Sequence, residues 1–471
     1  MNRRQFLRRT SVLTCGLMLG SVSRGADSSF PVVRTPEDKR RFKSRAVERT
    51  IETIRARIGN KELAWMFENC FPNTLDTTVD FQVVDGRPDT YLVTGDIDAM
   101  WLRDSAAQVW PYLPLMKNDS NLQQLVAGVI NRQTRCILKD PYANGFYKDD
   151  SKVSRWKSDL TDMKPGVHER KWELDSLCYP IRLAYHYWKA SNDRAPLDAT
   201  WRQAILLTLQ TFREQQRKTG PGPYRFQRRT EVPGDTLAGG GYGPPAKPVG
   251  LIYSMFRPSD DATVFPFLVP SNYFAVVSLR QAAELLTQIH HDQETANQCR
   301  ALADEVEAAL REYAVVMHEK YGRILPYEID GYGNSYCLDD PGYPSLLSLP
   351  YLDAVGPGDP LYLNTRRFVL SDSNPYYVIG KAASGPGGPH VGRDMVWPLG
   401  LIMQALTSTD DQEVRQCLVT LQKTHAGKGF IHEAFNKDDS DAFTRPWFAW
   451  ANSLFGELIL KSYKERAHVL N

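Results

Sequence analysis

The stretch WELDSLCYPIRLAYHYWKA, residues 172–190, sets the pattern of this chain. Charged residues come first, aromatic residues and a proline follow, and an apolar run then continues. The same order recurs from Arg103-Asp104-Ser105 into Val109-Trp110-Pro111, and from Arg393-Asp394 into Trp397-Pro398-Leu399. Carboxylates are favoured where a loop enters a helix, because the first backbone N–H groups have no partner within the helix. The repeat therefore predicts a ring of helical hairpins whose polar loops converge on one face.

Helical periodicity dominates the rest of the chain. Apolar residues at spacings of three and four predict helices over 37–58, 122–137, 174–190, 198–216, 272–289, 294–313, 393–406, 412–424 and 447–463. Strand-like alternation is scarce, and short stretches such as 81–84 and 321–325 suggest small ribbons within loops. With about a dozen helices and no long charged linker, residues 29–471 are predicted to form a single all-α domain, an (α/α)6 barrel.

The first residues have the composition of a targeting segment. Residues 3–7, RRQFL, follow the twin-arginine export pattern, and the uncharged stretch 11–23 is too short to span a bilayer. We therefore expect residues 1–28 to be a signal peptide, and the mature protein to work in the bacterial periplasm or outside the cell. The formal net charge of +2 indicates no nucleic-acid partner, and no stable membrane span is expected. The oligomeric state has no signal in the sequence.

Cysteine and histidine motifs give no support to metal chemistry. Beyond the expected signal peptide the cysteines are Cys70, Cys136, Cys178, Cys299, Cys337 and Cys417. An oxidising compartment permits disulfides, but the scattered positions, without a CxxC pair, favour buried free thiols. HExxH and GxSxG are absent as well. We therefore expect no metal site and no cofactor.

Carboxyl groups among aromatic residues are the chemistry that remains. They gather in GDIDAMWLRDS (95–105), FRPSDDA (256–262), HVGRD (390–394) and GFIHEAFN (429–436). Any one of these could be a helix cap or one half of an ion pair. Together they suit glycoside hydrolysis, in which one carboxylic acid protonates the leaving oxygen and a carboxylate acts on the opposite side of the sugar. Burial among apolar groups helps such an acid to keep its proton near neutral pH.

The sequence closely resembles glycoside hydrolase family 125. The motifs that carry the resemblance are GDIDAMWLRDS (95–105), ELDSLCYP (173–180), FRPSDDA (256–262), HVGRDMVWPLG (390–400) and IHEAFN (431–436). The likeness runs in order through nearly the whole mature chain. The family comprises bacterial exo-α-1,6-mannosidases with an (α/α)6 barrel and no metal requirement. The resemblance implies an inverting hydrolase that removes terminal non-reducing α-1,6-linked mannose from an oligosaccharide or glycan.

The resemblance also assigns residues. It implies that the general acid is an Asp of FRPSDDA, with Asp260 as the first choice and Asp261 as the alternative, and that the general base is Glu433. The remaining motif residues are expected to bind the terminal mannose: Trp101, Arg103, Asp104, Asp175, Arg257, Asp261, His390, Arg393 and Asp394.

Two other functions are compatible with the same toroid. The first is a non-catalytic mannoside-binding protein, although both candidate carboxylates are retained. The second is another (α/α)6 carbohydrate enzyme, such as a sugar epimerase, which would use pairs of histidines for proton transfer, or a lyase, which would need more basic residues around an acidic polymer.

Overall fold

Residues 30–471 are described by the computed structural model of this chain, and the expected signal peptide, 1–28, lies outside the described residues. The six cysteines within 30–471 are free thiols, and all but Cys337 are buried, which confirms the prediction of unpaired cysteines. No helix in this part of the chain is long and apolar enough to cross a membrane.

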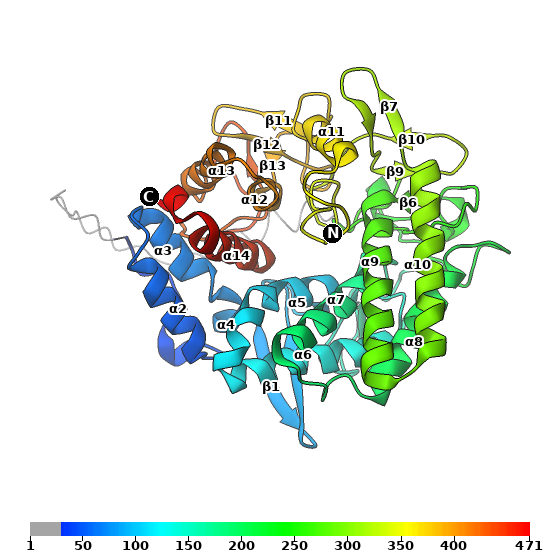
Figure 1. Cartoon of the computed structure of the whole chain (residues 1–471), viewed down its shortest axis with the longest axis horizontal. Helices are drawn as coiled ribbons and strands as arrows, with labels where there is room; N and C mark the ends of the chain where they lie inside the picture. Colours follow the sequence, from blue (N-terminus) through cyan, green and yellow to red (C-terminus); the bar gives the residue numbers. More distant parts are fainter. Residues whose placement is uncertain (1–29) are drawn as a thin grey trace.

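The helices form a ring that closes on itself (Figure 1). Near the start of the described chain, α3 (Lys61–Cys70) packs against the last long helix, α14 (Ala449–Arg466). The backbone N–H of Asn60 donates to the carbonyl of Leu470, with 3.4 Å between nitrogen and oxygen. The first and last hairpins therefore meet, and the ring has one seam.

The inner layer is made of helices that are buried on nearly all sides. They are α5 (Leu102–Val109), α7 (Leu174–Ser191), α9 (Val269–Leu285), α12 (Pro398–Leu406) and α14. Helix α7 packs on α5 and α9, and α14 packs on α12 and α5. The segment 343–354 also lies inside the ring: the Tyr343 carbonyl accepts from Tyr179 Oη at 2.7 Å, and Tyr351 Oη donates to Glu457 at 2.8 Å.

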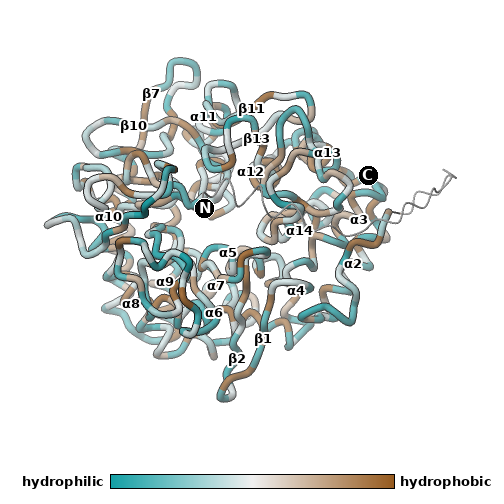
Figure 2. The backbone as a smooth tube through the Cα atoms, turned by 180° about the vertical axis from the view of Figure 1, so that it is seen from behind, coloured by the Kyte–Doolittle hydropathy of each residue, from teal (hydrophilic) through white to brown (hydrophobic). Residues whose placement is uncertain are grey.

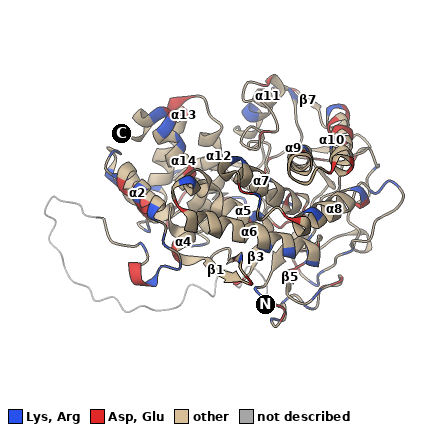
Figure 3. Ribbon diagram, turned by 60° about the horizontal axis from the view of Figure 1, so that its bottom comes forward, with Lys and Arg blue, Asp and Glu red and all other residues tan. Residues whose placement is uncertain are grey.

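The outer layer is amphipathic. It consists of α3, α6 (Ser120–Lys139), α8 (Ala199–Glu214), α10 (Gln293–Tyr313), α11 (Pro360–Val369) and α13 (Asp411–Lys423), with α2 (Arg45–Arg55) packed on α3. In α10 the buried residues Leu302, Val306 and Leu310 recur every fourth position, as expected of a helix with one buried face. Hydrophilic stretches alternate with hydrophobic ones along α8 and α10 (Figure 2), and charged residues gather on α2, α10 and α13 (Figure 3). Two concentric layers of helical hairpins make this chain an (α/α)6 barrel, which confirms the predicted fold.

The two layers differ at their helix starts. The six outer helices α3, α6, α8, α10, α11 and α13 each begin after an Asn or Asp whose side chain accepts from N–H groups of the first turn: Asn60, Asp119, Asp198, Asp292, Asp359 and Asp410. The inner helices begin after Trp101, Glu173, Leu268, Trp397 and Phe448, none of which makes a side-chain cap in the described structure. A cap contributes about 1 kcal/mol. The inner starts forgo this side-chain cap. At α5, α7 and α9 the first N–H donates instead to another segment: Leu102 to the Asn144 carbonyl, Leu174 to Ser254 Oγ and Val269 to the Tyr327 carbonyl.

Short strands connect the helices. The hairpin of β1 (Val79–Val84) and β2 (Arg87–Leu92) packs on α6, and β7 (Val316–His318) pairs with β8 (Gly322–Ile324); both confirm the expected ribbons. Three further sheets are β3–β4–β5 (Met100–Trp101, Gly145–Phe146, Val167–Glu169), β6–β9–β10 (Phe267–Leu268, Glu328–Ile329, Ser335–Tyr336) and β11–β12 (Tyr377–Ile379, Ser384–Pro386). The last pair, β13 (Met395–Val396) and β14 (Phe435–Asn436), joins two loops that are distant in sequence.

Two predicted helices are wrong in part. The helix expected over 37–58 begins only at Arg45, because Ser44 caps it by accepting from the N–H of Val47. The helix expected over 393–406 begins at Pro398, because the residues before it form β13 and Gly392 has a φ of 102°. The short α4 (Asn73–Thr77) and helices α3 and α11 were not predicted.

Candidate active site

A pocket of about 360 Å³ lies where the starts of α5 and α14 meet the loops 257–261 and 428–448. A volume of this order suits a small ligand such as a sugar unit. Six of the residues predicted from the sequence line it: Trp101, Arg103, Asp104, Asp260, His390 and Glu433. A smaller hollow of about 300 Å³ adjoins it and shares Asp96, Ile97, Arg155 and His168 with it. The fold thus brings together groups that are far apart in the sequence.

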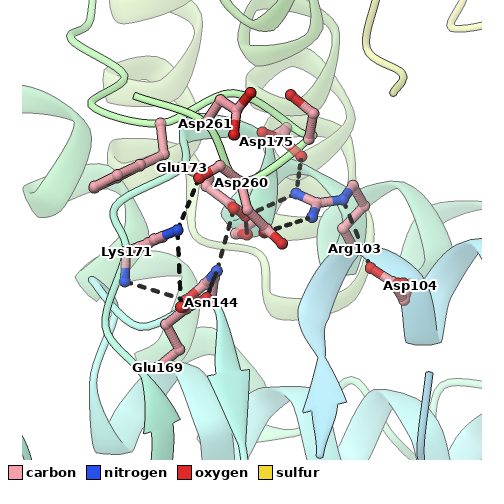
Figure 4. A network of polar contacts seen from close by, with 12 residues as sticks. Arg103, Asp104, Asn144, Glu169, Lys171, Glu173, Asp175, Asp260 and Asp261 are labelled. Carbon is pink, nitrogen blue, oxygen red and sulfur yellow. Dashed lines mark hydrogen bonds and ion pairs between the residues drawn. The ribbon is translucent and has the colours of Figure 1, made fainter. Parts of the chain in front are cut away.

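Arg103 is the hub of the polar groups in this pocket (Figure 4). Its Nη1 donates to Glu173 at 2.7 Å and to Asp175 at 3.2 Å, and its Nη2 lies 3.5 Å from Asp260. Its Nε lies 3.6 Å from Asp104, and the side chain is only 3% exposed. One buried guanidinium therefore faces four carboxyl groups, which it cannot neutralise if all of them are charged.

Proton uptake relieves this imbalance. Burial raises the pKa of Asp104 to about 6, against the attraction of Arg103 and with the help of the negative charge of Asp260. Burial also raises the pKa of Glu173 well above its ordinary value, and the charges of Asp260 and Asp175 add to this effect. Perturbed carboxyl groups that line a pocket are typical of catalytic sites.

Asp260 is held in a strained turn. Its φ of 67° is unusual for a residue with a Cβ. The turn is fixed by its N–H donating to the Arg257 carbonyl and by the N–H of Arg257 donating to the Asp261 carbonyl, both at 2.8 Å. Lys171 Nζ donates to the Asp260 carbonyl at 2.8 Å, and Ser259 Oγ donates to Asp340 at 2.7 Å. The turn places the side chain of Asp260 at the pocket, where it is 19% exposed.

Glu433 enters the pocket from the loop before α14. Its Oε2 accepts from Thr444 Oγ1 at 3.0 Å, and its Oε1 lies 3.5 Å from Arg445 Nη1. The loop is tied to α14, since the N–H of Ile431 donates to Asn452 at 2.9 Å. Both carboxylate oxygens thus have a donor that fixes their position while the residue stays at the pocket wall.

Asp261 has a different environment from its neighbour Asp260. Its Oδ1 lies 3.1 Å from His390 Nδ1, and the side chain is not among those that line the pocket. His390 does line the pocket, and its ring stacks on Trp397 with 5.9 Å between centroids. Asp261 therefore orients a residue of the pocket from behind.

Besides Asp261, four predicted binding residues lie outside the pocket lining. Asp175 is fully buried beneath Arg103, and Arg257 is buried and donates to Glu328 at 2.6 Å. Arg393 and Asp394 are exposed, and Asp394 lies 3.7 Å from Lys437. Asp175 and Arg257 can therefore act on a bound sugar only through neighbouring residues. Arg393 and Asp394 are not brought to the pocket.

Aromatic rings line the same space. Trp101 packs edge-on against His168, with 5.1 Å between centroids, and Trp450 lies beneath Arg103, at 5.5 Å from its guanidinium. Burial lowers the pKa of His168 to about 4, so this ring is neutral near neutral pH. Flat apolar faces of this kind pack on the faces of pyranose rings.

Several residues of the site were not predicted from the sequence. They are Asn144, His168, Glu169, Lys171, Glu173, Thr444 and Arg445. The dense run HERKWELD (168–175) was a usable signal, because five charged residues beside apolar ones are difficult to accommodate unless they pair. Within residues 30–471 no group of three or more His, Cys, Asp and Glu is arranged to hold a metal ion.

Replacing Arg103 with Met is expected to destabilise the protein by about 3–5 kcal/mol near neutral pH. The change removes the counter-charge of Glu173 and Asp175 without removing their burial. The loss should shrink as the pH falls below the pKa of about 6 of Asp104, because protonated carboxyl groups need no cation. Urea unfolding followed at several pH values measures both effects.

Arg393→Met is the matched control, since Arg393 is exposed. Its free energy of unfolding should stay within about 0.5 kcal/mol of the unmodified protein at every pH. Equal losses for the two variants would show that Arg103 has no special electrostatic role.

Comparison with known proteins identifies the family and two relatives of this chain. The family model described as metal-independent α-mannosidase (GH125) matches residues 60–460. The meiotically up-regulated gene 157 protein of Schizosaccharomyces pombe is 41% identical over 459 residues, which cover 94% of this chain and 90% of the yeast protein. A Streptococcus pneumoniae metal-independent α-mannosidase, solved as a non-productive complex with α-1,6-mannobiose, is 38% identical; the match has a TM-score of 0.87 and covers 90% of this chain and 100% of that one.

A more distant likeness concerns the fold alone. A bacterial glucoamylase solved with acarbose is 14% identical, with a TM-score of 0.52, and the match covers 91% of this chain and 57% of that one. The family model, by contrast, spans most of the chain, including the loops that carry Asp260 and Glu433. The chain therefore belongs to the metal-independent α-mannosidases of family GH125.

Proposed function

We propose that this α-mannosidase is exo-acting and inverting, and that it hydrolyses terminal non-reducing α-1,6-linked mannose. The observation that carries the proposal is the pair of carboxyl groups in one pocket, Asp260 and Glu433, in contrasting environments. Asp260 lies among other buried carboxyl groups, whereas Glu433 lies between a hydroxyl donor and a guanidinium. Such contrast is what separates the acid from the base in a glycosidase.

In the proposed reaction Asp260 is the general acid. It gives a proton to the glycosidic oxygen as the bond from that oxygen to C1 breaks. Glu433 is the general base and takes a proton from a water that attacks C1 from the opposite face. The contact between Asp261 and His390 supports Asp260, rather than Asp261, as the donor.

The sugar and its linkage are inferred from the pocket and from a relative. The buried Arg103 cluster and the rings of Trp101 and Trp450 enclose a space of about 360 Å³, which supports removal of a single terminal sugar. The S. pneumoniae relative binds α-1,6-mannobiose. We extend that linkage to this chain as part of the proposal.

Proton NMR on α-1,6-mannobiose tests linkage and stereochemistry together. The first product should be β-mannose, which then mutarotates, because a single displacement by water inverts C1. Mannobioses with α-1,2, α-1,3 and α-1,4 linkages serve as controls and should be cleaved much more slowly. An initial α product would contradict inversion, and faster cleavage of another linkage would contradict the proposed substrate.

A further inference from the structure

The carboxyl groups of Glu173 and Asp260 lie against each other at the edge of the pocket (Figure 4). Their side chains lie within hydrogen-bonding reach, so that a proton on either carboxyl group can be shared with the other. Both also contact Arg103, at 2.7 Å from Nη1 for Glu173 and at 3.5 Å from Nη2 for Asp260. Glu173 is fully buried, whereas Asp260 reaches the pocket. The contact therefore links the pocket to a group that solvent does not reach.

Two carboxyl groups in hydrogen-bond contact are poorly compatible with two negative charges. The repulsion between them makes the pair retain one proton, as in other buried carboxyl pairs. The pKa of Glu173 is raised well above its ordinary value, first by burial and then by the charge of Asp260. The contact therefore favours a state in which the two carboxyl groups together hold one proton.

The other partners of Glu173 are all donors. Its Oε2 accepts from Arg103 Nη1 and from Ser176 Oγ, the latter at 2.8 Å, and its Oε1 accepts from Asn144 Nδ2 at 3.1 Å. Each of these bonds strengthens when the carboxyl group becomes charged. The surroundings of Glu173 therefore accommodate both of its protonation states.

We propose that Glu173 is a positioning residue that stores the catalytic proton and supplies it to Asp260. This inference rests on the proposed role of Asp260 as general acid. The shared proton passes from Glu173 to Asp260 and from Asp260 to the glycosidic oxygen, whose bond to C1 breaks with both electrons moving to that oxygen. The water that attacks C1 gives a proton to Glu433. The pair then regains one proton from solvent and Glu433 releases one, so the cycle balances.

Glu173→Gln tests this role, because the amide has the same shape and still donates to Asp260 but cannot give up a proton. At neutral pH kcat/KM on α-1,6-mannobiose should fall by about 100-fold. The alkaline limb of the pH profile should move to lower pH by about one unit or more, since Asp260 no longer faces a second carboxyl group. Activity on a dinitrophenyl α-mannoside, whose leaving group needs little protonation, should stay near that of the unmodified enzyme.

Asp175→Asn is the matched control, since it removes another buried carboxylate that pairs with Arg103, at 3.2 Å. It should lower activity on both substrates equally and move the alkaline limb less. If Glu173→Gln gave the same pattern as this control, the proton-storage role would be overturned. Asp260→Asn separates the two proposals: if it still cleaved mannobiose at a normal rate, the role of Asp260 itself would fail, whatever Glu173→Gln does.

Infrared difference spectroscopy provides a test that needs no activity. The difference spectrum between the unmodified enzyme and Glu173→Gln near neutral pH should contain a protonated-carboxyl C=O band that shifts in D₂O. Bands of other protonated carboxyl groups, such as Asp339, whose pKa is raised to about 7 by burial, cancel in this difference. If that variant does not fold, Asp260→Asn answers the same question: without the charge of Asp260, the pKa of Glu173 should fall and its C=O band should disappear at a lower pH than in the unmodified enzyme. A band with unchanged pH dependence in Asp260→Asn would overturn the shared proton.

Discussion

Replacing Glu433 with Gln is expected to lower kcat by about 10²–10⁴-fold. The amide keeps the size of the side chain and its contact with Thr444, at 3.0 Å in the unmodified protein, but cannot take a proton from water. The attacking water would then remain a weak nucleophile. The loss should be as large with a dinitrophenyl mannoside as with mannobiose, because both need the water. Initial rates on the two substrates measure it.

Glu68→Gln is the control for this variant. Glu68 pairs with Arg55 at 2.8 Å on the outer surface, so the same chemical change occurs away from the pocket. Its kcat should be unchanged. Near-normal turnover by Glu433→Gln would mean that another group activates the water.

Replacing Asp260 with Asn is expected to cause a loss of similar size on mannobiose, about 10²–10⁴-fold, but a much smaller one on an activated mannoside. The acid matters only where the leaving group needs a proton. Melting temperatures should show whether the loss is chemical, because the turn that holds Asp260 is formed by backbone groups that the substitution retains.

Asp261→Asn is the matched variant for the adjacent position. Its carboxyl group contacts His390 at 3.1 Å and does not line the pocket. We expect a moderate loss that does not depend on the leaving group, since a displaced His390 weakens sugar binding in both cases. If this variant, rather than Asp260→Asn, showed leaving-group dependence, the two aspartates would exchange roles.

Much of the fold could be predicted because the outer helices carry their signals locally. The periodic apolar residues and the Asp caps of α8, α10 and α13 place those helices within a few residues of the predicted ranges. Helix α3 was missed because its centre, 63–67, is a continuous apolar run that is buried throughout, so its few polar residues do not reveal a helical period. The start of α12 was misplaced because β13 pairs with β14, whose sequence is far from it.

The site could be predicted only where chemistry was concentrated in one motif. Arg103 and Asp104 stood out because charges next to Trp101 are costly in a core. Glu173 lies two positions before Asp175, yet only the folded chain shows that the carboxyl group of Glu173 lies within hydrogen-bonding reach of Asp260. No local pattern marks Thr444 as a partner of Glu433, because that contact is made by the path of a loop.

The uncapped starts of the inner helices limit how this enzyme can be engineered. Adding Ser or Asp before an inner helix would gain about 1 kcal/mol in an ordinary helix. Here it would replace residues such as Trp101 or Phe448 that line the pocket, or Glu173 beside Asp260. Stability and activity are thus assigned to different layers of the ring. Thermostabilising substitutions belong in the outer layer, where the helix starts are remote from the chemistry.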